Sequence, residues 1–159
     1  MKCTFCGHKH IYNDKLLYKK LVDEVRHLAC LGVTTFYSGG YGEFDTLALS
    51  AVFDVQKEFS SIQNIVVVPY ITQSHLNHYE YQLEKYNAYT IYPFETEVMP
   101  RFAIIKRNQW MVDNSDYVIT YVTRTGGGAF NTFEYAIKKK KTFIDLTTQM
   151  QEDNLQYLK

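Results

Sequence analysis

A continuous run of β-branched residues, Ile65–Val68, most constrains the fold of this chain. Such a run is typical of a strand that is covered on both faces, as in a parallel sheet flanked by helices. Upstream of it, apolar residues recur at helical spacing: Leu17, Leu21, Val25 and Leu28. Segments of strand and helix character alternate in this way along the whole chain. The alternation predicts parallel strands that are joined by right-handed crossovers.

Gly, Pro and helix-capping residues indicate where each element is expected to begin and end. Strands are predicted over Lys2–Cys6, Val33–Tyr37, Ile65–Val68, Tyr89–Tyr92, Tyr117–Val122 and Thr142–Leu146. Helices are predicted over Leu16–Cys30, with a cap at Asn13 or Asp14, and over Phe44–Phe59, His75–Tyr86, Pro100–Asn114 and Asn131–Lys139, with Gln151–Leu158 as a short helix or a tail. The expected fold is a single Rossmann-like α/β domain over residues 1–159, a mainly parallel sheet with helices on both faces.

Composition narrows the classes of partner. The chain has 159 residues, of which 46% are hydrophobic, and its formal net charge is zero. The length suits one domain with a real core. A net charge of zero gives no support to a broad attraction for nucleic acid or for an anionic membrane, so neither is an expected partner. Because the sequence lacks both an apolar run of about 18 residues and the apolar stretch of a signal peptide, a cytoplasmic location is expected.

The cysteines allow two interpretations. An odd number, Cys3, Cys6 and Cys30, argues against a disulfide framework. Cys3 and Cys6 form a CxxC pair that precedes His8 and His10, which suits a zinc site or a redox pair. The alternative is a first strand with small, soft residues buried in it. Since no second ligand pair follows at zinc-finger spacing, we expect the strand, with no metal and no cofactor.

Two glycine-rich turns indicate a ligand site. Each turn follows a predicted strand and opens a predicted helix: one holds Ser38, Gly39 and Gly40, and the other holds Gly126, Gly127 and Gly128. Such a turn presents unpaired backbone N–H groups and the positive end of a helix dipole, and glycines let a phosphate or ribose come close. Both turns belong at the carboxyl edge of the sheet, where ligands bind. Although neither matches a GxGxxG or P-loop motif, together they predict a nucleotide-type ligand.

Side chains near these turns have alternative roles. His8, just after the first strand, can contact the ligand, act as an acid–base group or bond to nearby backbone. Asp45 can cap a helix or accept a ribose hydroxyl. Arg107 can clamp a phosphate or hold Glu134 ionised, or it can be an exposed residue of an amphipathic helix. Glu134 can supply a carboxylate for ribose or proton chemistry, or complement the start of its helix.

In their order and spacing these residues resemble the SLOG superfamily, the SMF/DprA–LOG group of Rossmann-like proteins. The nearest pattern is its small YspA/YoqJ-type branch, common in Firmicutes and their prophages. The resemblance covers nearly the whole chain and rests on Cys6-Gly7-His8-Lys9, Ser38–Asp45, Arg107-Asn108 with Met111, Ser115-Asp116, and Gly127-Gly128 with Thr132 and Glu134.

The resemblance implies that the chain binds a nucleotide or a nucleotide-derived signal. The ligand-binding residues are then Gly7, His8, Ser38, Gly39, Gly40, Asp45, Asn108, Gly126, Gly127, Gly128 and Thr132. A homodimer is also implied, because relatives commonly pair, and the abundance of Tyr and Phe in this chain suits an interface.

A better-known branch of the superfamily, the Lonely-guy phosphoribohydrolases, cleaves the N-glycosidic bond of adenosine-monophosphate derivatives. Its signature is an Arg-Lys pair on a helix followed by P-G-G-x-G-T-x-x-E. Arg107 and Glu134 match it and would be the catalytic residues. Asn108 replaces the lysine, Phe130 the third glycine and Asn131 the threonine. Phe130 cannot freely adopt glycine's backbone angles. These departures therefore weaken the prediction of hydrolase activity more than the prediction of nucleotide binding.

Three hypotheses follow from the sequence. The first is a binding or sensing module for a nucleotide-derived molecule. The second is a phosphoribohydrolase, and the third is a protein associated with single-stranded DNA, like the DprA branch.

Overall fold

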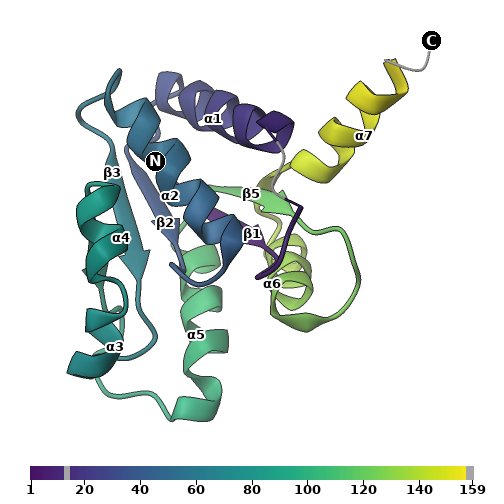
Figure 1. The fold of residues 1–159 in the computed structure, drawn as a ribbon. Coiled ribbons are helices and arrows are strands. Elements are labelled where there is room, and N and C mark those ends of the chain that lie inside the picture. The colour runs from purple at the N-terminus through teal and green to yellow at the C-terminus, as the bar shows by residue number, and fades with distance from the viewer. Residues whose placement is uncertain (13–14, 157–159) are drawn as a thin grey trace.

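The computed structural model describes residues 1–12 and 15–156, and the predicted cap at Asn13 or Asp14 lies outside them. The chain forms a six-stranded sheet with the order β4-β3-β2-β1-β5-β6, and every neighbouring pair is parallel (Figure 1). The strands are β1 (Lys2–Gly7), β2 (Thr35–Ser38), β3 (Gln63–Val67), β4 (Ala88–Ile91), β5 (Tyr117–Tyr121) and β6 (Thr142–Asp145). The predicted Rossmann-like α/β fold is confirmed.

Helices cover both faces of the sheet (Figure 1). They are α1 (Lys15–Cys30), α2 (Glu43–Gln56), α3 (Gln73–Asn77), α4 (Glu80–Lys85), α5 (Pro100–Asp113), α6 (Gly127–Lys138) and α7 (Leu146–Gln156). Alternation along β2 shows how the layers form, because successive side chains of a strand point to opposite faces. Phe36 packs into the core under α1 and α2, whereas Tyr37 packs against Met111 and Trp110 of α5.

Three helices differ clearly from their predicted bounds. One is α7, which begins at Leu146 and not at Gln151, and positions 157–158 of the predicted segment Gln151–Leu158 lie outside the described residues. The predicted helix His75–Tyr86 is divided into α3 and α4, with Tyr79 buried between them in the small core beside β3. Helix α6 begins at Gly127 and not at Asn131. Glycine has a low intrinsic helix propensity, so the sequence pattern hides a helix whose first residues are glycines.

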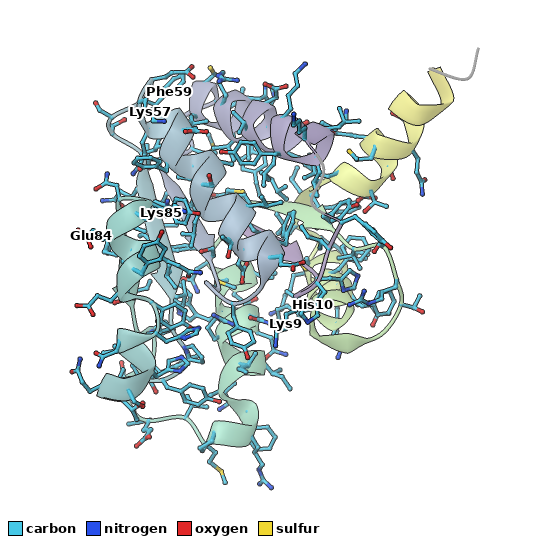
Figure 2. The ribbon with its side chains drawn as sticks, in the orientation of Figure 1. Lys9, His10, Lys57, Phe59, Glu84 and Lys85 are labelled. Carbon is cyan, nitrogen blue, oxygen red and sulfur yellow. The ribbon has the colours of Figure 1, made fainter. Side chains whose placement is uncertain are left out.

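The topology places the carboxyl ends of the strands at one edge of the sheet. From β1 the chain moves outward to β4 on one side, and it then crosses to β5 and β6 on the other side. The order of the strands therefore reverses between β1 and β5, which is where open α/β sheets form a ligand crevice. Near this edge, Lys9 and His10 lie by the N-terminal end of α2 (Figure 2), where the Lys9 carbonyl accepts a hydrogen bond from the Glu43 N–H. Among residues 1–12 and 15–156, no helix has the length and apolar character needed to cross a membrane.

Candidate functional site

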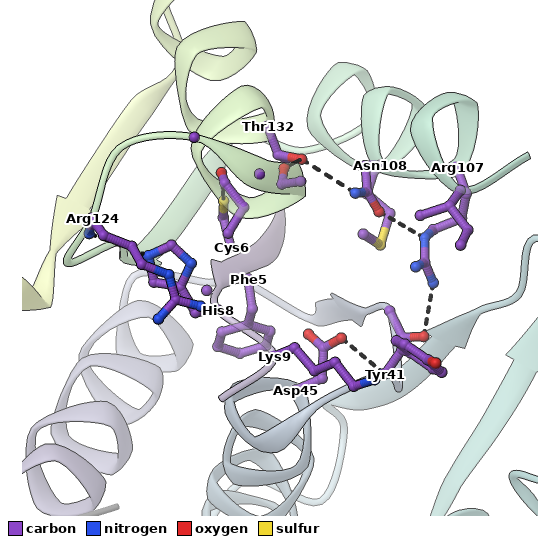
Figure 3. Close-up of a pocket in the computed structure, with 18 residues that line it drawn as sticks. Phe5, Cys6, His8, Lys9, Tyr41, Asp45, Arg107, Asn108, Arg124 and Thr132 are labelled. Atoms are coloured by element: carbon purple, nitrogen blue, oxygen red, sulfur yellow. Dashed lines mark hydrogen bonds between the residues drawn. The ribbon is translucent and has the colours of Figure 1, made fainter. Parts of the chain in front are cut away.

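A cavity of about 300 Å³ lies at the carboxyl edge of the sheet, between the end of β1 and the N-terminal end of α6 (Figure 3). Most of the predicted site residues line it: the binding residues Gly7, His8, Gly39, Asp45, Asn108, Gly126, Gly127, Gly128 and Thr132, and the predicted catalytic residue Arg107. The lining also includes residues that were not predicted to bind a ligand, among them Lys9, Tyr41, Ile104 and Arg124. Lys9 and Tyr41 lie within the quoted motifs but were not assigned a binding role, and for Ile104 and Arg124 the only available signal was their position on α5 and after β5.

Two predicted residues of the first glycine turn do not line this cavity. Ser38 is buried, and its place in β2 puts it on the same face as Phe36, under the α1–α2 layer. Gly40 has a positive φ of 64°, and a Cβ built on it would lie 2.6 Å from Cγ1 of Val66 and 2.9 Å from the ring of Tyr79. Gly40 therefore lets the backbone turn against β3 and the buried Tyr79.

Glu134, the predicted catalytic carboxylate, is exposed on α6 and is not among the residues that line the cavity. Gly128, Ala129 and Thr132 of the same helix do line it. Each residue advances about 100° around an α-helix, so Glu134 is rotated by about 200° from Thr132 and points away from the cavity. The spacing between Gly127 and Glu134 matches the hydrolase signature, but Glu134 lies on a face of α6 that is turned away from the cavity.

The N-terminal end of α6 opens onto the cavity without a capping side chain. Gly126 and Gly127 have φ values of 85° and 80°, which residues with a Cβ rarely adopt. Gly128 lies within the helix and its φ is not positive. Apart from its chain neighbours and the nearby backbone of its own helix, a Cβ built on any of these glycines would meet no protein atom within 4 Å. The conformation of the turn therefore accounts for Gly126 and Gly127, whereas at Gly128 the glycine only keeps space open.

Arg107 is a buried residue that joins two strand ends. Its side chain is 4% exposed, and Nη1 donates a hydrogen bond of 2.7 Å to the carbonyl oxygen of Gly39, at the end of β2 (Figure 3). Nη1 donates a second bond of 2.7 Å to the carbonyl oxygen of Val67, at the end of β3. Nε donates to Oδ1 of Asn108 at 2.8 Å. Burial lowers the pKa of Arg107, and the charge of Asp45 opposes that shift. Arg107 is thus not the exposed residue that one sequence interpretation allowed.

Asn108 links the hydrogen bonds of Arg107 to α6. Its Nδ2 donates to Oγ1 of Thr132 at 3.2 Å, and that hydroxyl donates to the carbonyl of Gly128 at 2.8 Å. A line of hydrogen bonds therefore runs from the ends of β2 and β3 through Arg107 to the first turn of α6. Because it links separate elements, it fixes the position of the α6 N-terminus relative to the sheet.

Asp45 closes the first glycine turn. Its Oδ2 accepts a hydrogen bond of 2.9 Å from the N–H of Tyr41, just before α2. Burial raises the pKa of Asp45, whereas the charge of Arg107 and hydrogen bonds from the backbone of Tyr41 and Gly39 oppose that shift. A Cβ on Gly39 would lie 2.8 Å from Nη1 of Arg107 and 2.9 Å from Oδ2 of Asp45. Glycine at this position therefore allows both side chains to reach the turn.

His8 holds the loop between β5 and α6. Its side chain is buried, and its Nε2 accepts hydrogen bonds from the N–H groups of Thr123 at 3.2 Å and Arg124 at 3.4 Å. Nε2 must be unprotonated to accept them, so the neutral ring carries its proton on Nδ1. Burial lowers the pKa of His8, and the charge of Arg124 lowers it further. Of the three roles that the sequence allowed for His8, the structure shows the hydrogen bond to nearby backbone.

This arrangement predicts a pH dependence of stability. A histidine of the unfolded chain has a pKa near 6.5, whereas the pKa of His8 in the folded chain is lower. Stability is therefore lost as the pH falls below about 6.5, by at most about 1.4 kcal/mol per pH unit for one proton. His8→Gln keeps an oxygen acceptor near the two N–H groups and does not titrate. We expect the free energy of unfolding of the wild type, relative to His8→Gln, to fall between pH 8 and pH 5 in urea titrations. Parallel curves would contradict this role, since His75, whose pKa burial also lowers, is common to both proteins.

The cysteines of the CxxC pair lie on opposite faces of β1. Cys3 belongs to the core under α1 and α2, whereas Cys6 packs with Val112 and Ala136 on the other side. The Cys6 thiol donates to the carbonyl of Ala129 at 3.1 Å, and burial raises its pKa to about 12. Within the described parts of the chain, no three His, Cys, Asp or Glu side chains are grouped closely enough to hold a metal ion.

We compared the chain with models of known protein families. The model of the YspA SLOG family matches residues 8–153. The chain belongs to the YspA SLOG family. The match confirms the resemblance that the motifs indicated. A comparison with curated proteins finds no match.

Several solved structures have a similar fold at low sequence identity. DNA processing protein A from Streptococcus pneumoniae is 18% identical with a TM-score of 0.63, covering 91% of this chain and 49% of that one. The chain thus spans about half the length of the pneumococcal protein. The single-stranded-DNA-binding DNA processing protein A from Helicobacter pylori is 17% identical with a TM-score of 0.63, covering 97% and 73%. A molybdenum cofactor binding protein from Rippkaea orientalis is 16% identical with a TM-score of 0.54, covering 97% and 83%. At these identities the likeness concerns the fold alone.

Proposed function

We propose that this member of the YspA SLOG family binds a nucleotide or a nucleotide-derived small molecule, with a phosphate at the N-terminal end of α6. The observation that carries the proposal is Gly128. In a helix, glycine costs about 1 kcal/mol relative to alanine, and neither backbone angle nor packing requires it here. A ligand that approaches the backbone gives this glycine a purpose, because a Cβ would occupy the ligand's space.

The charges around the cavity suit a phosphate. The first N–H groups of a helix have no acceptor within the helix, and its dipole adds positive potential at the same end. Lys9, Arg107 and Arg124 line the cavity, and Asp45 is the one acidic residue among the described residues of its lining. The volume of about 300 Å³ is at the lower end of the range for small-molecule sites.

Binding without hydrolysis is the better supported activity. A phosphoribohydrolase needs an acidic group at the reacting sugar, and Glu134 lies on another face of α6. Asp45 lines the cavity, but one of its oxygens already accepts the N–H of Tyr41. Arg107 is the other residue that matches the hydrolase signature, and its Nη1 donates hydrogen bonds to two backbone carbonyls. We therefore place a binding or sensing role first and hydrolysis second.

Gly128→Ala tests the proposal, because it separates binding from folding. In calorimetric titrations with AMP, GMP, CMP and UMP, we expect the wild type to bind at least one of them and Gly128→Ala to lose at least about tenfold in affinity. The free energy of unfolding should stay equal or rise by up to about 1 kcal/mol, because alanine is the better helix former. The same samples, assayed for ribose 5-phosphate, should release none.

Gly32→Ala is the matched control. Gly32 follows α1, has a φ of 92° and does not line the cavity. Alanine there should lower the free energy of unfolding by about 1–2 kcal/mol and leave nucleotide affinity unchanged. Wild-type affinity in Gly128→Ala would show that the phosphate site is misplaced. Failure of the wild type to bind any nucleotide would refute the function itself.

The other sequence hypotheses stay predictions of lower rank. A homodimer would cover some of the exposed apolar side chains of α5 and α6, such as Ile105 and Ile137. Single-stranded DNA binding has less support, because the net charge is zero and the described site is a small cavity.

A further inference from the structure

A second cavity adjoins the proposed phosphate site. It has a volume of about 430 Å³ and shares Tyr41, Ile104 and Arg107 with the first cavity. The rest of its lining comes from the segment after β3 and from α3 and the residues that follow it. Because the same side chains border both spaces, a ligand held at α6 can extend past Arg107 into the second cavity.

One wall of the second cavity is made of fixed aromatic rings. Tyr70 and His75 meet edge to face with their centroids 4.9 Å apart, and His75 meets Tyr79 in the same way at 5.2 Å. The hydroxyl of Tyr70 donates to the carbonyl of Pro100 at 3.1 Å, and the hydroxyl of Tyr79 lies 3.3 Å from Nε2 of His75. These bonds hold the rings in place before any ligand arrives, which reduces the entropy cost of binding.

The opposite border is more exposed. Tyr41 has 49% of its surface accessible, and the ammonium of Lys9 lies 4.9 Å from its ring centre. Among the described residues, no carboxylate lines the second cavity, whereas Arg107 contributes a cation and Thr72 and Ser74 contribute hydroxyls. Fixed aromatic rings, hydroxyls and the absence of acidic groups suit a planar ring that carries hydrogen-bond acceptors, as a nucleobase does.

We propose that the second cavity is the base subsite of the same ligand: the N-terminal end of α6 holds the phosphate, and the rings of Tyr70 and His75, which the buried Tyr79 supports, hold the nucleobase. This inference rests on the proposed function and sharpens it, because it selects a nucleoside phosphate over a sugar phosphate. Arg107 lies where the two parts of the ligand join.

The test compares AMP, GMP, CMP and UMP with ribose 5-phosphate, which has the phosphate and sugar but no base. The wild type should bind its preferred nucleotide at least about tenfold more tightly than ribose 5-phosphate, in line with the usual gain from stacking a base on aromatic side chains. Tyr70→Leu should lose most of that advantage and keep its affinity for ribose 5-phosphate. Tyr70→Phe, which retains the ring, should stay within about threefold of the wild type for the nucleotide.

Tyr81→Leu is the matched control, because Tyr81 is 70% exposed on α4 and lines neither cavity. Urea titrations establish that each variant is folded, and His75→Leu replaces Tyr70→Leu if the latter is not. Unchanged nucleotide affinity in Tyr70→Leu or in its replacement would overturn the base subsite and leave the phosphate site standing. Normal binding of every compound by Gly128→Ala would show that the phosphate site is misplaced, and failure of the wild type to bind any nucleotide would refute the proposed function, so the failures are distinguishable.

Discussion

Arg107→Ala is expected to lower the free energy of unfolding by about 3–5 kcal/mol, even without a ligand. The guanidinium is 4% exposed and supplies the donors for the carbonyls of Gly39 and Val67. Its removal leaves both carbonyls without that donor, and Asp45, whose pKa burial already raises, loses the positive charge that opposes the shift. Urea denaturation followed by circular dichroism measures the loss.

Arg101→Ala provides the comparison on the same helix. Arg101 is exposed in the first turn of α5, where its guanidinium lies 4.6 Å from the ring centre of Phe102, so its loss should cost less than about 1 kcal/mol. In the double variant Arg107→Ala/Asp45→Asn, the loss should be smaller than the sum of the single losses, because the uncompensated carboxyl is gone. Wild-type stability in Arg107→Ala would mean that Arg107 does not hold the strand ends together.

Gly7→Ala is expected to destabilise the fold by roughly 3 kcal/mol, the upper end of the usual cost of overpacking. A Cβ on Gly7 would overlap the ring of Phe44 and approach Cβ of Phe44 to 2.8 Å. Phe44 is 1% exposed in the first turn of α2, so it cannot swing out into solvent. The added methyl group must therefore push α2 away from the end of β1.

A double-mutant cycle isolates this contact. In a Phe44→Ala background the ring is absent, and Gly7→Ala should then cost less than about 1 kcal/mol. Thermal unfolding of the four proteins gives the coupling energy. Gly128→Ala, where a Cβ meets nothing within 4 Å, is the glycine control in the same experiment. An equal cost of Gly7→Ala in both backgrounds would contradict the assignment to Phe44.

Apolar patterning was sufficient to predict the sheet, because the four inner strands, β1, β2, β3 and β5, each bury a short apolar segment between two layers of helices. The run Ile65–Val68 and the stripe from Leu17 to Leu28 both correspond to buried positions. Short polar elements were predicted less well. The split between α3 and α4 depends on Tyr79 packing beside Val66, a tertiary contact that no local pattern encodes.

The candidate site could be predicted to the level of the loop but not of the helix face. The glycine turns were predicted to lie at the carboxyl edge of the sheet, and the cavity lies at that edge. The helical period alone implies that Thr132 and Glu134 point in nearly opposite directions, but which of the two faces the cavity depends on how α6 packs in the fold, and the sequence could not determine that. The same limit applies to Arg107, since nothing in its neighbours along the chain indicates that the carbonyls of Gly39 and Val67 surround it.

The open space at Gly128 has a consequence for protein engineering. A laboratory selection for heat resistance alone would favour alanine at this position, since it gains helix stability and meets no neighbouring atom. If the space belongs to a ligand, that selection enriches robust proteins that have lost their affinity. Selections carried out with and without a nucleotide in the medium should then diverge at position 128, with glycine retained only in its presence.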